Sequence, residues 1–111
     1  MVDFLDSVMA AEKNNKSFLC VGLDPDPAHM PAHLAGEPDG VFQFCRGIVD
    51  ATHDLVLAFK PQIAFFAAQA AEGQLRRLIE YIHANTEIPV ILDAKRADVT
   101  STSTMYAREA F

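Results

Sequence analysis

Three short apolar runs, separated by longer amphipathic stretches, constrain the fold of this chain more than any other feature. The runs cover residues 18–23, 55–60 and 88–93, and each ends at or next to a charged residue. Strands buried on both faces of a parallel sheet have this continuous apolar pattern, because helices cover both faces. We therefore predict three parallel strands joined by crossover helices.

Apolar residues recur at helical spacing outside these runs. One helix is expected before the first run, ending near Asn14–Asn15. A second helix follows the segment 24–40, whose four prolines and two glycines predict a loop, and Asp39 is the predicted cap of that helix. A third helix is expected after Pro61 and a fourth from Ser101 onwards. This order indicates an α/β fold, but it does not separate an open sheet from part of a barrel.

Composition excludes several classes of protein. The net charge of -6 argues against nucleic-acid binding, because phosphate contacts need clustered basic residues. No apolar run approaches the roughly 18 residues that span a bilayer, and the first residues do not resemble a secretory signal. Cys20 and Cys45 lack C-x-x-C spacing, which favours a reducing cytoplasm. Cys20 lies inside an apolar run, and we expect it to be chemically inert.

Charged residues stand where the predicted strands end. Asp24 follows the first strand, Lys60 ends the second and Asp93 ends the third. The carboxyl ends of parallel strands meet at one edge of a sheet, where ligands bind. Asp93 and Lys95 point to the same side of an extended segment. We expect a charged row of alternating sign made by Lys60, Asp93, Lys95 and Asp98.

Such a charged row has a chemical use. Opposite charges side by side stabilise each other's ionised form. Charges that are already in place before a substrate binds need little reorganisation during a reaction. The alternative interpretation is a structural cluster of loop ion pairs with no chemical role.

Three segments carry a resemblance to a known family. LDAKRADVTSTSTMYAREAF (residues 92–111), with its D-x-K-x-x-D element, resembles the signature of the orotidine 5'-phosphate decarboxylase family. FKPQIAFF (59–66) resembles the second-strand motif of that family, and FLCVGLDPDP (18–27) resembles its first-strand exit. The match is closest to the longer bacterial branch. It implies that residues 1–111 are the N-terminal part of a single (β/α)8-barrel domain, an N-terminal helix with about three βα units, in a chain that looks truncated.

The resemblance also implies a function. It implies decarboxylation of orotidine 5'-phosphate to uridine 5'-phosphate in pyrimidine biosynthesis, without metal or organic cofactor, by a cytoplasmic homodimer with shared active sites. Asp93 would face the substrate carboxylate and Lys95 would protonate C6. Ala97 stands where the family usually has Gly. The implied catalytic residues are Lys60, Asp93, Lys95 and Asp98, and the implied substrate-binding residues are Asp24, Lys60, Val99 and Thr102.

Two alternatives stay open. The first is another enzyme of the same superfamily, such as a 3-keto-gulonate-phosphate decarboxylase or a hexulose-phosphate synthase, which would be expected to use Mg²⁺. The second is a truncated fragment without catalytic activity. Phosphate-binding barrels commonly hold the phosphate in loops after the seventh and eighth strands. Because this chain has no such strands, we expect it to be inactive on its own.

Overall fold

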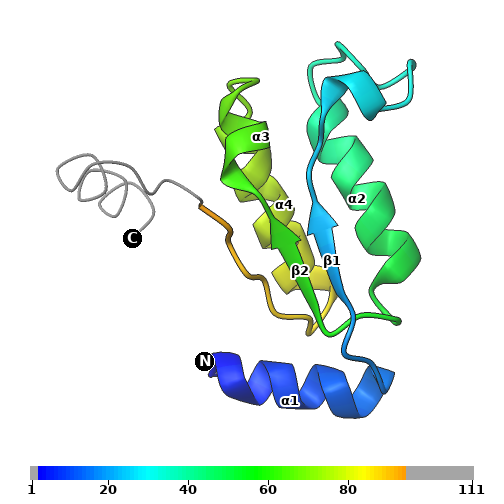
Figure 1. The fold of residues 1–111 in the computed structure, drawn as a ribbon, viewed down its shortest axis with the longest axis vertical. Helices are drawn as coiled ribbons and strands as arrows, with labels where there is room; N and C mark the ends of the chain where they lie inside the picture. The colour runs from blue at the N-terminus through cyan, green and yellow to red at the C-terminus, as the bar shows by residue number, and fades with distance from the viewer. Residues whose placement is uncertain (1–2, 95–111) are drawn as a thin grey trace, which may run out of the picture.

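The computed structural model describes residues 3–94 as an α/β fold (Figure 1). The elements in chain order are helix α1 (Phe4–Asn15), strand β1 (Cys20–Leu23), 3-10 helix η1 (Pro27–His29), helix α2 (Gly40–Thr52), strand β2 (Ala58–Pro61), helix α3 (Ile63–Ala67) and helix α4 (Glu72–Asn85). The helix predicted from Ser101 lies outside the described residues. None of the helices within residues 3–94 is both long and apolar enough to cross a bilayer.

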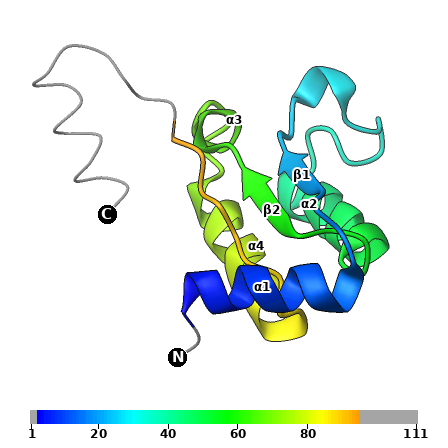
Figure 2. The ribbon, with the colours of Figure 1, turned by 60° about the horizontal axis from the view of Figure 1, so that its bottom comes forward.

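The sheet is parallel, as predicted. β1 pairs with β2 in a register that places Gly22 beside Lys60. The segment after α4 joins β2 through two parallel bridges, Phe59 with Val90 and Gln62 with Asp93, which belong to one register. β2 lies between β1 and this segment in both views (Figures 1 and 2). The third predicted strand is therefore present as a segment paired with β2, although it makes two separate bridges rather than a continuous ladder.

Both named strands start later than the apolar runs predict. β1 begins at Cys20, whereas Phe18 lies outside it with 80% of its surface exposed. β2 begins at Ala58, because Leu55 belongs to the exposed turn that follows α2. Pro61 is the last residue of β2 rather than the first residue after it. It lacks an N–H, but its carbonyl oxygen accepts a hydrogen bond from Asp93 N at 3.0 Å, so the pairing continues through it.

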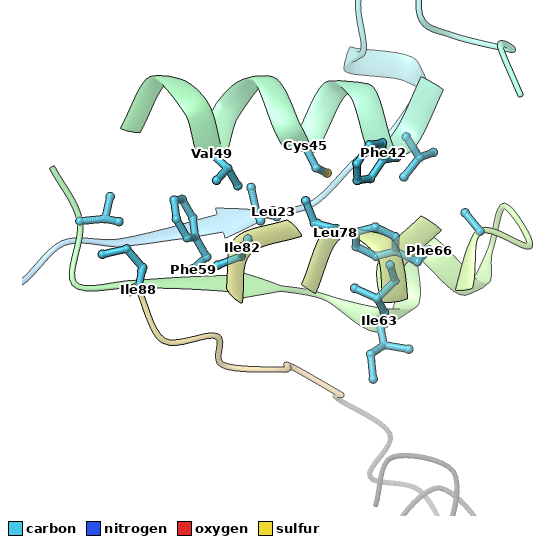
Figure 3. Packing of buried hydrophobic residues seen from close by; sticks show 14 of the residues in the cluster. Leu23, Phe42, Cys45, Val49, Phe59, Ile63, Phe66, Leu78, Ile82 and Ile88 are labelled. Carbon is cyan, nitrogen blue, oxygen red and sulfur yellow. The ribbon is translucent and has the colours of Figure 1, made fainter. Parts of the chain in front are cut away.

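One face of the sheet carries the core. α2 and α4 lie side by side on this face (Figure 2). The apolar side chains of the two strands meet those of the two helices between the layers (Figure 3). Burial of this apolar surface is the main source of stability for the layer. The fully buried members include Leu23, Phe59, Cys45, Val49, Leu78 and Ile82.

The opposite face of the sheet, which we call the open face, carries Cys20, Gly22 and Lys60. Cys20 and Gly22 are exposed on it, whereas Ala58, which pairs with Cys20, is buried. The prediction that the first strand is buried on both faces is therefore wrong for residues 3–94, because helices cover one side only. α1 lies instead at the end of the sheet where the strands begin (Figure 1). There Asn15 Nδ2 donates to the carbonyl oxygen of Val56 at 2.9 Å.

Two helices, rather than the single predicted one, connect β2 to the third strand segment. The chain reverses after α3, where Ala70 has a φ of 52°. This left-handed conformation costs an L-residue roughly 1–2 kcal/mol. It lets Ala71 N donate to Phe66 O at 2.8 Å, and α4 starts directly afterwards. The sequence shows no Gly or Pro at this break, so periodicity alone did not reveal it.

The start of α2 is stabilised by α4 and not by the predicted cap. Asp39 occupies the N-cap position, but its side chain makes no capping hydrogen bond. Its carboxylate instead accepts a hydrogen bond from Arg77 of α4 at 2.6 Å, which lowers the pKa of Asp39. Phe42 N donates to Gln74 Oε1 at 2.8 Å, and Arg77 stacks on the Phe42 ring. Side chains of α4 therefore bind the start of α2 in place of the predicted cap.

We expect Leu78→Ala to destabilise the protein by about 2–5 kcal/mol, because Leu78 is fully buried between the two layers. The free energy of unfolding, measured by urea denaturation, tests this. Glu80→Ala is the matched control, an exposed change in the same helix, and should stay within about 0.5 kcal/mol of the unmodified protein. Equal midpoints for the two variants would contradict this packing.

Candidate functional site

The pairing of the strands places three charged residues on the open face. Paired residues of a parallel ladder point to the same side, and so do residues two apart in a strand. Gly22 pairs with Lys60, and Asp24 follows Gly22 by two residues. Gln62, two residues beyond Lys60, pairs with Asp93. Asp24, Lys60 and Asp93 therefore share one face at the carboxyl ends of the strands.

Lys60 and Asp93 form an ion pair at this edge. Lys60 Nζ lies 3.6 Å from Asp93 Oδ2, with side-chain exposures of 40% and 14%. The backbone of Asp93 is held on both sides, since its N–H donates to Pro61 O at 3.0 Å and its carbonyl accepts from Ile63 N at 2.9 Å. These two hydrogen bonds fix the backbone position from which the carboxylate extends. The pair joins two neighbouring parts of the sheet at the place where a ligand can reach both.

Asp24 lies at the same edge without joining the ion pair. Its carboxylate lies near the open side of Gly22, since a Cβ added there would meet Asp24 Oδ2 at 3.7 Å. Gly22 is the register partner of Lys60, so this carboxylate lies over the strand next to the lysine. Among the ion pairs within residues 3–94, none involves Asp24. The side chain is exposed and accessible to a ligand.

The rest of the expected site lies beyond the described residues. Lys95, Asp98, Val99 and Thr102 are outside residues 3–94, as is Ala97. Their assigned roles stay predictions. Only the first two members of the charged row, Lys60 and Asp93, have a described geometry.

Sequence reasoning gave no role to Gln62, although the structure places it in this site. It is half-buried, shares the open face with Lys60 and pairs with Asp93. Its spacing of two residues from Lys60, at the end of an extended segment, was the signal that could have identified it.

Of the two cysteines, only Cys20 departs from its predicted surroundings. Cys20, expected to be inert inside a covered strand, is exposed on the open face. Cys45 of α2 is buried on the other side of the sheet. Burial raises the pKa of its thiol to about 12, and the charge of Asp24 adds to this. Cys45 therefore stays a neutral core side chain at physiological pH.

The described residues contain no obvious metal site. Within residues 3–94, no three His, Cys, Asp or Glu side chains are grouped so that they could hold a metal ion.

The buried thiol of Cys45 should make the stability of the protein depend on pH in the alkaline range. Its pKa in the folded protein exceeds the ordinary value of 9.0, so the unfolded chain loses the thiol proton first as pH rises. The stabilising contribution is complete below about pH 9 and is lost between about pH 9 and 12. We expect the free energy of unfolding to fall more steeply over this range in the unmodified protein than in Cys45→Ala. Cys20→Ala, which changes the exposed cysteine, should keep the unmodified slope, and parallel curves for all three would refute the shift.

The sequence matches one known family over most of its length. The family is described as the orotidine 5'-phosphate decarboxylase / HUMPS family, and the match covers residues 17–111. An orotidine 5'-phosphate decarboxylase of Azoarcus sp. (strain BH72) is 61% identical over 109 residues, which are 97% of this chain and 40% of that protein. The enzyme of the same name from Ralstonia pickettii (strain 12J) is 62% identical over the same shares of each chain.

Solved structures show the same similarity at lower identity. The structure of OMP decarboxylase from Leishmania donovani superposes with a TM-score of 0.68 at 33% identity, covering 99% of this chain and 40% of that one. The chain thus spans about 40% of the length of the curated relatives it matches.

Proposed function

Because this chain belongs to the orotidine 5'-phosphate decarboxylase / HUMPS family, we propose that the full-length protein containing it converts orotidine 5'-phosphate to uridine 5'-phosphate. The reaction is a decarboxylation that needs no metal or organic cofactor and serves pyrimidine biosynthesis. The observation that carries the proposal is the Lys60–Asp93 ion pair at the carboxyl ends of parallel strands. The protein acts in the cytoplasm as a homodimer, with no nucleic-acid or membrane partner.

Residues 1–111 form the first part of a single (β/α)8-barrel domain in this proposal. The parallel pairing of the strands in their chain order supports it, because a barrel adds each strand beside the previous one. The open face is then the side that turns toward the barrel interior. Its residues support this assignment, since Ile91, which the register of the two bridges sets beside Lys60, adds an exposed apolar side chain to it.

The proposed role of each charged residue follows from the place where negative charge develops on the substrate. Loss of carbon dioxide leaves a carbanion at C6 of the pyrimidine, and the protein must stabilise it by electrostatics. Lys95 carries the positive charge that approaches C6 and then delivers the proton. Its attraction to the substrate grows as negative charge develops, which favours the transition state over the ground state. Asp93 faces the departing carboxylate, while Lys60 holds Asp93 in place.

The remaining groups hold the substrate and join the subunits. Asp24 and Lys60 hydrogen-bond the ribose, since both lie on the open face at the strand ends. Asp98 completes the charged row from the neighbouring subunit. Val99 and Thr102 reach across the same interface. The isolated chain is inactive in this scheme, because the phosphate-binding loops of such barrels come from later strands. Turnover by the purified chain would contradict that.

Asp93→Asn should lower kcat of the full-length enzyme by about 100-fold or more, because it removes a preorganised charge next to the reacting carboxylate and its ion pair with Lys60. Loss of substrate absorbance during decarboxylation measures the rate. Asp54→Asn is the control, a substitution at an exposed aspartate in the turn that precedes β2, and should leave kcat unchanged. An Asp93→Asn enzyme with normal kcat would remove this residue from the reaction.

Magnesium separates the proposed enzyme from its metal-dependent relatives. The superfamily alternatives, which are sugar-phosphate enzymes, would be expected to need Mg²⁺, and its removal abolishes the chemistry that the metal supplies. We expect the full-length enzyme to decarboxylate orotidine 5'-phosphate at the same rate after dialysis against EDTA and after addition of Mg²⁺. Activity that is lost on chelation and restored by Mg²⁺ would favour the alternative.

A further inference from the structure

A side chain from outside the loop 24–40 holds the exit of β1. Gln69 follows α3, and its Nε2 donates to the carbonyl oxygens of Pro25 at 2.7 Å and Phe65 at 2.8 Å. A side-chain amide has two N–H donors, so both are used. The bond to Phe65 anchors the amide on its own segment. The bond to Pro25 crosses to the loop that begins with Asp24.

From this geometry we propose that Gln69 is a positioning residue that sets the Asp24 carboxylate beside Lys60 and so determines how tightly the ribose of the substrate is held. The inference rests on the proposed function, in which Asp24 contacts the ribose. It assigns a role to a residue that does not itself touch the substrate.

Few other hydrogen bonds hold the backbone around Asp24, whose neighbours Leu23 and Pro25 are fully buried. Leu23 O accepts a hydrogen bond from Gln62 N at the long distance of 3.3 Å, and Asp26 N donates to Asp24 O within the same turn at 2.8 Å. Within the described part of the chain, no other side chain from outside the loop 24–40 hydrogen-bonds residues 24–26. The Pro25 carbonyl belongs to the peptide unit that joins Pro25 to Asp26, so the bond from Gln69 restrains the turn one residue beyond Asp24.

A partly open pocket of about 360 Å³ borders the loop beyond this exit, with Pro27 and Met30 from the loop and Gln69 and Gln74 among its lining residues. Side chains from outside the loop make hydrogen bonds near both of its ends. Gln69 holds the first end, and Gln74 Oε1 holds the second through Phe42 N at 2.8 Å. Both glutamines hydrogen-bond the backbone, Gln69 as a donor and Gln74 as an acceptor, but only Gln69 bonds the residue next to Asp24.

The experiment compares these two glutamines in the full-length enzyme. Gln69→Ala should raise KM for orotidine 5'-phosphate about five- to tenfold with kcat nearly unchanged, because it weakens a contact made in both ground and transition states. Gln69→Lys keeps an N–H donor of similar reach and should bring KM back to within about twofold of the unmodified value. Gln74→Ala should lower the melting temperature without raising KM. If Gln69→Ala fails to fold, Gln69→Met keeps the length of the side chain without the donors.

A double-mutant cycle tests whether Gln69 acts through Asp24. In an Asp24→Ala background, the effect of Gln69→Ala on KM should disappear, since the residue it positions is gone. A normal KM for Gln69→Ala, or a full effect that persists without Asp24, would overturn this inference and leave the proposed function standing. Failure of the unmodified enzyme to decarboxylate the substrate would overturn both.

Discussion

The parallel pairing of β2 with both of its neighbours is the constraint on which the rest of the structure depends. Backbone hydrogen bonds on either side of Asp93 set the register of its segment. That register decides which side chains face the helices and which share the open face, because a slip of one residue would exchange the two sets. Phe59 then lies in the core, while Lys60 and Asp93 meet on the other side.

The two faces of this sheet carry different kinds of side chain. The covered face binds α2 and α4 through apolar packing, and α4 also satisfies the start of α2 through Gln74 and Arg77. None of these contacts involves a charged group of the open face. The open face holds the Lys60–Asp93 ion pair, and a side chain from a crossover segment reaches its edge. Gln69 is the described example, since it reaches from one crossover to the exit of another.

The sequence predicted the alternation of helices and strands but not the residues at which the strands begin. Continuous apolar runs indicated strands, yet Phe18 and Leu55 fall outside them, because apolar character alone does not show where backbone pairing starts. The break at Ala70 was missed because a positive φ at alanine leaves no compositional trace. Asp39 had the right residue type for a cap, but a guanidinium from α4 competes for its carboxylate.

The sequence by itself determined the α/β order, the family and the residue types at the strand ends. Apolar runs, helical periodicity and short motifs are local properties, and a chain carries them without folding. Only the tertiary structure decided that Lys60 meets Asp93, that Asp24 stays at the edge beside them, and that Cys20 is exposed while Cys45 is buried. These outcomes depend on register and on which face the helices cover. Both arise from contacts between segments that are far apart in the chain.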